Sequence, residues 1–123
     1  MLIEYKSFST DPLTLLQRRW FQDDYFDLFV WITEKNALHA WQLCYDRQGL
    51  EGMLTWHQKR NHLTHERLDD GEASPLHNRT PIAIPDGLPP MTMVYLQFQQ
   101  RASHLPSFIF DPILAQLALA AKI

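Results

Sequence analysis

This 123-residue sequence has one cysteine, four glycines and no apolar run approaching the ~20 residues of a membrane-spanning helix. The single cysteine, Cys44, excludes an internal disulfide and is typical of a reducing compartment. The opening residues MLIEYKSFST lack the basic start and the long apolar segment of a signal peptide. We therefore expect a cytoplasmic protein with no membrane partner.

Neither acidic nor basic residues are in large excess. The 14 acidic and 11 basic residues give a formal net charge of −3 and are spread along the chain. Nucleic-acid-binding proteins normally have a basic stripe that neutralises phosphates, so nucleic acid is not an expected partner. Glycine-rich phosphate loops, paired CxxC zinc ligands and G-x-S-x-G turns are absent as well. These absences favour a protein that binds rather than an enzyme.

Four runs rich in aromatic and branched residues lie between residues 25 and 69, separated by three short polar breaks. This pattern is typical of an antiparallel meander. We place two-residue turns at Lys35-Asn36, Gln48-Gly49 and Lys59-Arg60, the first two because Asn and Gly tolerate the positive φ of tight hairpins. These turns define the register, in which a one-residue slip moves every side chain to the other face.

The predicted register aligns apolar side chains across neighbouring strands. The aligned pairs are Phe26 with Tyr45, Leu28 with Leu43, Val30 with Trp41, Ile32 with His39, Trp41 with Trp56, Leu43 with Leu54, and Trp56 with Leu63. We expect this set to form the core face of the sheet, where such pairs contribute roughly 0.2 to 1 kcal/mol each.

The opposite face of the predicted sheet mixes apolar and polar side chains. It is too apolar to be left bare, although one face of an antiparallel sheet is usually solvated. We therefore predict a surface for a partner protein or a small ligand, formed by Phe29, Trp31, Gln42, Met53 and Thr55. The expected partner is a second copy of the chain, in a homodimer, or another protein.

The segments before and after the meander complete a single expected domain over residues 1–123. Residues 1–8 alternate weakly and are expected to form an edge strand, and Asp11-Pro12 resembles the start of a short helix over residues 13–20. Proline-rich sequence predicts an irregular segment over about 70–89, in which only residues 80–84 are extended enough for an edge strand.

Helical periodicity begins near residue 90 and continues to about 122. Pro106 is expected to end a first helix, and Asp111-Pro112 resembles the start of a second. Packing both helices on one face of the sheet buries both apolar stripes. The predicted fold class is therefore α+β, an antiparallel β-meander of four to five strands with two C-terminal helices packed on one face.

A metal site is the alternative function that the residues suggest. His57, His62 and Glu66 share the amphipathic face in the predicted register and have the donor atoms that zinc and iron accept. A metal-binding protein or a metal-dependent enzyme would need a divalent ion here. The spacing of the three residues matches no established motif, and polar residues are expected beside a turn.

The densest basic patch consists of Lys59, Arg60 and Arg67 with His57, His62 and His65, so it shares two histidines with that cluster. Because Glu66, Asp69 and Asp70 lie beside it in the sequence, a solvated hairpin end is the preferred interpretation, ahead of an anion site.

Two other catalytic arrangements are disfavoured. Cys44 lies in the middle of a predicted strand, where a buried and inert thiol is expected. Asp27, Glu51 and Glu66 share a face and resemble surface carboxylates more than an acid–base pair.

Overall fold

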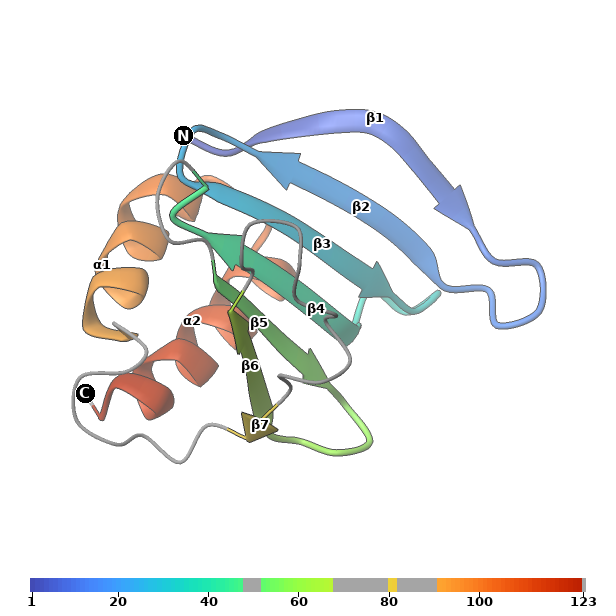
Figure 1. Cartoon of the computed structure of the whole chain (residues 1–123). Coiled ribbons are helices and arrows are strands. Elements are labelled where there is room, and N and C mark those ends of the chain that lie inside the picture. The colour runs from blue at the N-terminus through green and yellow to red at the C-terminus, as the bar shows by residue number, and fades with distance from the viewer. Residues whose placement is uncertain (48–51, 68–79, 82–90, 123) are drawn as a thin grey trace.

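The computed structural model describes residues 1–47, 52–67, 80–81 and 91–122, and all side chains in these ranges except those of residues 6–9, 67 and 80–81. An antiparallel sheet is followed by two helices (Figure 1). The elements are β1 (Ile3–Thr10), β2 (Gln17–Gln22), β3 (Phe26–Ile32), β4 (Leu38–Tyr45), β5 (Gly52–His57), β6 (Leu63–Arg67), β7 (Thr80–Pro81), α1 (Met91–Ala102) and α2 (Ser107–Ala121).

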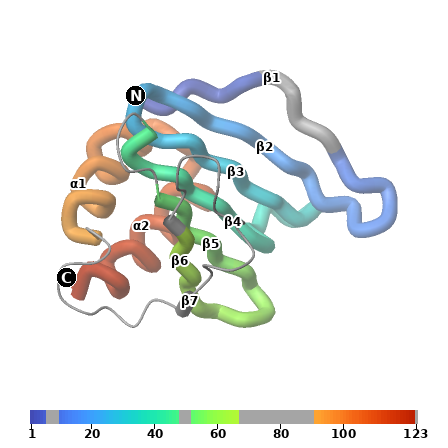
Figure 2. Tube along the Cα trace, viewed as in Figure 1, coloured from blue at the N-terminus to red at the C-terminus, as the bar shows by residue number. Residues whose placement is uncertain are grey.

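The strands lie in the sheet in the order of the sequence, from β1 to β7, and neighbouring strands are antiparallel (Figure 2). The predicted α+β meander with two C-terminal helices is therefore confirmed. The strand expected over residues 1–8 is β1, at the edge of the sheet. The strand count is higher than the four to five predicted because β2 takes the place of a predicted helix and the two-residue β7 follows β6. The remainder of the predicted irregular segment lies outside the described residues.

The predicted register is confirmed at every pair but one. The confirmed pairs are Phe26 with Tyr45, Leu28 with Leu43, Val30 with Trp41, Trp41 with Trp56, Leu43 with Leu54, and Trp56 with Leu63. Ile32 aligns with Leu38 instead of His39, because the register between β3 and β4 shifts after Trp31. The bulge brings Leu38 into the core and places the His39 ring 4.5 Å from that of His57.

The loops at the end of β3 and β5 are longer than the two residues predicted. Thr33 N–H donates to the Ala37 carbonyl at 2.9 Å, and Asn36 has a φ of 59°. Between β5 and β6, Asn61 has a φ of 51°. Asparagine thus supplies the left-handed residue of both loops, as its short polar side chain allows. The predicted turn at Gln48-Gly49 lies outside the described residues.

The core lies between one face of the sheet and the two helices. Figure 1 shows α1 and α2 together on the same side of the sheet. The Phe26 ring of β3 meets the Phe98 ring of α1 edge-on at 5.9 Å, and both side chains are fully buried. The other largest fully buried side chains are Leu2, Phe21, Leu28, Ile32, Trp41, Leu43, Leu54, Ile109, Ile113 and Leu117.

The helix predicted over residues 13–20 is wrong. The chain turns after Asp11, and β2 occupies residues 17–22 between β1 and β3. Trp20 and Phe21 point to opposite faces, and only Phe21 enters the core. The hydrogen bonds of β2 to β1 and β3 outweigh the helical spacing of its apolar residues. A helix of this length would be only marginally stable by itself.

The second helix begins earlier than predicted. Pro106 is the residue before α2, and its carbonyl accepts from Ile109 N–H and Phe110 N–H at 2.9 Å. Pro112 consequently lies inside the helix, where it has no N–H to donate to the Phe108 carbonyl. Burial of Ile109 extends the helix forward against the sheet despite this loss.

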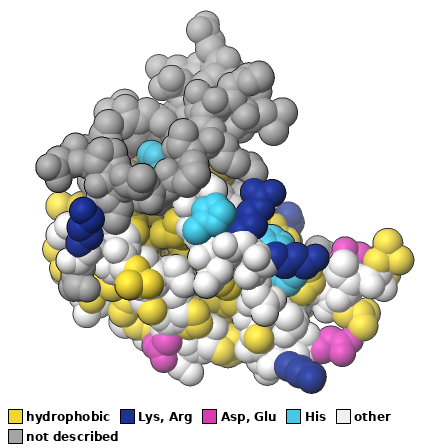
Figure 3. All heavy atoms as spheres, turned by 90° about the horizontal axis from the view of Figure 1, so that it is seen from below, with side chains coloured by type: hydrophobic (Ala, Val, Ile, Leu, Met, Phe, Trp, Pro, Cys, Tyr) yellow, Lys and Arg dark blue, Asp and Glu magenta, His cyan; other side chains and the backbone are white. Residues whose placement is uncertain are grey.

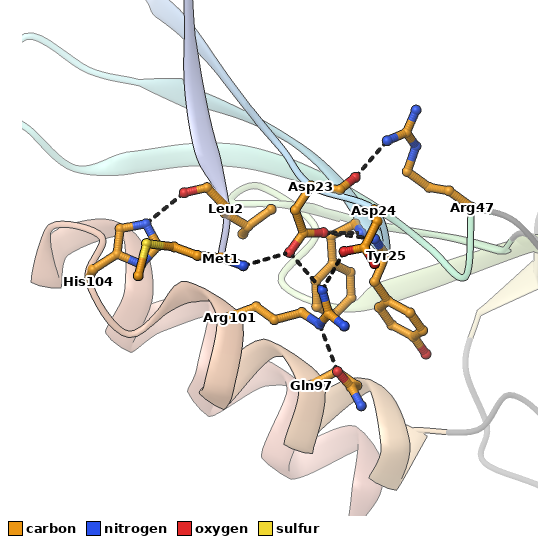
Figure 4. A network of polar contacts seen from close by, with 10 residues as sticks. Met1, Leu2, Asp23, Asp24, Tyr25, Arg47, Gln97, Arg101 and His104 are labelled. Carbon is orange, nitrogen blue, oxygen red and sulfur yellow. Dashed lines mark hydrogen bonds and ion pairs between the residues drawn. The ribbon is translucent and has the colours of Figure 1, made fainter.

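Asp23, in the turn between β2 and β3, joins the sheet to α1 (Figure 4). One carboxylate oxygen accepts from Tyr25 N–H and Phe26 N–H at 2.8 Å, and the other lies 3.0 Å from Arg101 and 3.4 Å from the Met1 amino group. Burial raises the pKa of Asp23, but these backbone hydrogen bonds and Arg101 outweigh it, so the pKa is lowered overall.

Replacing Asp23 tests this junction. We expect Asp23→Ala to lower the free energy of unfolding by about 2 kcal/mol, since it leaves backbone donors and Arg101 without an acceptor. The wild-type contribution of the carboxylate is present above about pH 4 and is lost as the pH falls through the lowered pKa of the folded state. Urea denaturation of both proteins at pH 7 and pH 3 measures this.

Asp24→Ala is the matched control. Asp24 is 73% exposed and contacts the same Arg101 atom at 2.7 Å, so its loss should cost at most about 0.5 kcal/mol. Equal losses in the two variants would contradict the assigned role of Asp23.

Candidate functional site

The sheet face opposite the helices, called the outer face below, carries three cross-strand rows that follow from the register. The first row is Ile3, Gln22, Asp27, Cys44, Met53 and Glu66. The second is Tyr5, Trp20, Phe29, Gln42, Thr55 and Thr64, and the third is Arg18, Trp31, Ala40 and His57.

Four aromatic rings form a continuous stack on this face, across β1, β2 and β3. Tyr5 and Trp20 have ring centroids 4.6 Å apart, Trp20 and Phe29 5.5 Å, and Phe29 and Trp31 6.5 Å. The Arg18 guanidinium lies over the Phe29 ring at 5.6 Å, within the range of cation–π attraction. We call Tyr5, Trp20, Phe29 and Trp31 the aromatic ladder.

The ladder is held in place and stays accessible. Trp20 Nε1–H donates to the Asp27 carboxylate, which fixes the central ring. Tyr5 is 42% exposed, and the other three rings are half-buried. These rings present a large and rigid contact area. Folding has already ordered them, so a partner that binds here loses little side-chain entropy from them.

The structure brings most of the predicted binding residues together. Phe29, Gln42 and Thr55 are consecutive members of the second row, and Trp31 lies beside Phe29 on the same face. Met53 also belongs to the outer face but is buried, so it is not available to a partner in this conformation.

Tyr5, Trp20 and Arg18 are members of this surface that the sequence reasoning missed. Trp20 and Arg18 lie within the helix predicted over residues 13–20, and the sequence predicts no register for the edge strand that contains Tyr5. The segment QRRWFQ places Arg18, Trp20 and Gln22 on one face and Arg19 and Phe21 on the other, so each face mixes polar and aromatic residues. Apolar and polar residues therefore do not alternate along it, and periodicity gives no signal for this strand.

The loop between β1 and β2 borders the ladder. Asp11 Oδ1 accepts from Leu13 N–H at 2.9 Å, and the Asp11 carbonyl accepts from Leu15 N–H at 2.8 Å. This ordered loop leaves Leu13 92% exposed and Leu15 48% exposed. Leu15 has a φ of 60°, a conformation that costs roughly 1 kcal/mol or more in a non-glycine residue. A pocket of ≈ 440 Å³ between the loop and the sheet is lined by Arg18, Trp31 and loop residues.

A second pocket, of ≈ 380 Å³, lies where β5 and β6 are joined. Its described lining residues are Thr55, His57, Lys59, Arg60, His62 and Thr64. We call it the basic pocket. Figure 3 shows Lys, Arg and His side chains gathered on this end of the molecule, which faces the viewer there.

His57 is the titratable group on which these charges act most clearly. Partial burial lowers its pKa, and His39, Lys59 and Arg60 lower it further by charge repulsion. Its Nδ1 accepts from Lys59 N–H at 3.2 Å, so in the neutral ring the proton is on Nε2.

We expect the pKa of His57, measured by NMR titration of its ring protons, to lie below the 6.5 of an unperturbed histidine. Lys59→Ala should raise it, because one repelling charge is removed. In the wild type, the lowered pKa means that the unfolded chain binds this proton more readily than the folded chain does. The contribution of His57 to the free energy of unfolding therefore falls as the pH drops through about 6.5.

Lys122→Asn provides the control, since Lys122 is exposed at the end of α2 and Asn tolerates its left-handed conformation. A His57 pKa at or above 6.5, unchanged by Lys59→Ala, would show that the basic pocket exerts no such field.

The residues of the metal hypothesis are only partly brought together. His57 and His62 line the same pocket, whereas Glu66 is 1% exposed and is not among the described residues that line it. Within residues 1–47, 52–67, 80–81 and 91–122, no group of three or more His, Cys, Asp or Glu side chains is arranged to hold a metal ion. The metal site stays a prediction without geometric support.

The other catalytic candidates gain nothing from the structure. Cys44 is buried, as expected for an inert thiol. Asp27 is engaged by Trp20, and Glu51 lies outside the described residues. His65, from the sequence patch, bonds to Tyr45 Oη at 2.7 Å and does not join the basic pocket.

Comparison of the chain with protein-family models, with curated proteins and with solved structures found no match. Of the helices in the described part of the chain, none is long and apolar enough to span a membrane.

Proposed function

We propose that this protein is a non-enzymatic interaction domain that binds a second copy of itself through the aromatic ladder and the adjacent loop. The observation that carries the proposal is the half-exposed stack of four rings on the sheet face that the helices do not cover.

The composition of this surface supports a protein partner. Protein interfaces are enriched in Tyr, Trp, Phe and Arg and depleted in acidic residues at their centre. The ladder has the aromatic residues and Arg18, and the carboxylate of Asp27 is already bonded to Trp20. Ile3, which is 65% exposed, extends the apolar area along β1.

The loop leucines support the same conclusion. Leu13 and Leu15 are presented to solvent by a loop with its own hydrogen bonds, and Leu15 adopts a conformation that leucine rarely takes. Neither side chain belongs to the core. A residue that weakens folding and adds nothing to the core is expected at a position where it contributes to binding.

A second copy is the partner that the surface fits best. A twofold dimer needs one self-complementary surface, and here the aromatic ladder lies next to exposed leucines and a pocket lined in part by Trp31. In a twofold arrangement the loop of each chain can insert beside the ladder of the other.

The double variant Leu13→Ser/Leu15→Asn tests this interface. We expect wild-type protein to sediment as a dimer at micromolar concentration and the variant as a monomer. The monomer should fold, with a melting temperature measured below the association range that is unchanged or raised, because Asn accepts a positive φ more readily than Leu.

Leu119→Ser is the matched control, since Leu119 is 70% exposed on α2, among the helices rather than on the outer face. It should leave the dimer intact. A wild-type monomer at all accessible concentrations, or a dimer broken equally by Leu119→Ser, would refute the proposed self-association.

Binding of a small ligand is the second candidate, and the pocket beside Trp31 and Arg18 favours it. A monomeric wild-type protein whose Trp31 emission responds to small aromatic ligands would support this candidate over the dimer.

A further inference from the structure

We propose that the basic pocket binds the phosphoryl group of a small phosphorylated molecule. The site does not rest on the dimer, and the two hypotheses fail independently. Four of its six described lining residues carry or can acquire a positive charge, and the other two are threonines with hydroxyl groups. No carboxylate is among the lining residues that the structure describes.

Of the acidic residues that argue against an anion site in the sequence, Glu66 is not among the described residues that line this pocket. Glu66 is buried, and it follows Thr64 along β6 away from the loop. Asp69 and Asp70 lie outside the described residues. Of these three acidic residues, the one that the structure describes therefore lies outside the lining that Lys59 and Arg60 belong to.

The loop that carries the cations is ordered by its own backbone. The His57 carbonyl accepts from Arg60 N–H at 3.1 Å and from Asn61 N–H at 2.9 Å, and the His39 carbonyl accepts from Gln58 N–H at 2.9 Å. These three backbone donors are not available to an anion, so the proposed recognition relies on side chains. Lys59 and Arg60 lie between the two histidines in the sequence, so one short segment supplies all four side chains.

The two imidazoles are oriented by hydrogen bonds from the loop. His57 Nδ1 accepts from Lys59 N–H, which leaves Nε2–H as a donor. His62 Nδ1 lies 3.1 Å from the Arg60 carbonyl, which can only accept, so Nδ1 carries a proton. A bound anion stabilises the protonated form of His57, whose added proton lies on Nδ1 and replaces the hydrogen bond from Lys59 N–H.

The size and the donors favour a phosphoryl group on a small molecule. Lysine and arginine form charge-assisted hydrogen bonds with phosphate oxygens, and arginine can bind two oxygens at once. A volume of ≈ 380 Å³ lies within the range of small-molecule sites, about 300–1,000 Å³, and exceeds what one phosphate group fills.

Titration with inorganic pyrophosphate at constant ionic strength, followed by amide NMR, tests the site. We expect saturable shifts at residues 57–64, and a dissociation constant raised at least about tenfold by Lys59→Ala/Arg60→Ala, as the loss of charge-assisted hydrogen bonds implies. Lys122→Asn is the matched control and should bind as the wild type does. The Leu13→Ser/Leu15→Asn variant should also bind, because its substitutions lie in another loop.

The pKa of His57 provides a second readout that a structural defect in the variant would not imitate. The charged and titratable groups that face this ring are His39 from β4 and Lys59, Arg60 and His62 from the loop region. Saturating pyrophosphate should raise the pKa of His57, and by linkage the affinity should increase as the pH falls through that pKa.

Three results would overturn the proposal. They are shifts that do not saturate, equal weakening by Lys122→Asn, and a His57 pKa that pyrophosphate leaves unchanged. Tighter and strongly salt-dependent binding of a single-stranded oligonucleotide, spread beyond residues 57–64, would replace the small molecule with nucleic acid.

Discussion

The alignment of β3 with β4 is the constraint on which the rest of the structure depends. It sets Val30 against Trp41 and Leu28 against Leu43, and all four side chains are fully buried. The same register continues outward to the other strands, so the face of each side chain is decided at this central pair. A slip of one residue would expose Trp41 and bury its polar neighbour Gln42 in the core.

Because both helices follow the sheet in the sequence and pack together, they cover one face only.

The two ends of the sheet also differ. At one end, Asp23 connects the turn between β2 and β3 to Arg101 of α1 and to the N-terminus. At the other end lie the three loops that follow β1, β3 and β5, away from this junction. Both proposed sites lie toward the loop end, where binding does not compete with the contacts that hold helices and sheet together.

Much of the fold was predictable because runs of aromatic and branched residues, separated by short polar breaks, mark the central strands. Errors occurred where a tertiary effect overrides a local pattern. Trp20 has helical spacing to earlier residues but is held in β2 by two neighbouring strands. His39 is displaced by a bulge that no local pattern indicates. Pro112 is tolerated inside α2 because Ile109, which precedes it in the helix, is buried.

The candidate surface was predictable in part for the same reason. Phe29, Trp31, Gln42 and Thr55 follow directly from the register of the central strands, whereas Tyr5 and Arg18 depend on the pairing of β1 and β2. Whether a side chain is buried was harder to predict than the face of the sheet on which it lies. Met53 and Glu66 lie on the outer face as expected, yet both are buried. Pattern alone says which way a side chain points, not what else contacts it.

Acrylamide quenching of tryptophan emission, measured across protein concentration, tests most directly whether the outer face is a binding surface. We predict that quenching is efficient in dilute solution, where Trp20 and Trp31 are partly exposed, and decreases as dimers form. The double variant Trp20→Phe/Trp31→Phe should remove most of that decrease. Association that leaves quenching unchanged, or protection that persists in full in the double variant, would contradict the proposed interface, because the protected tryptophans would then lie outside the aromatic ladder.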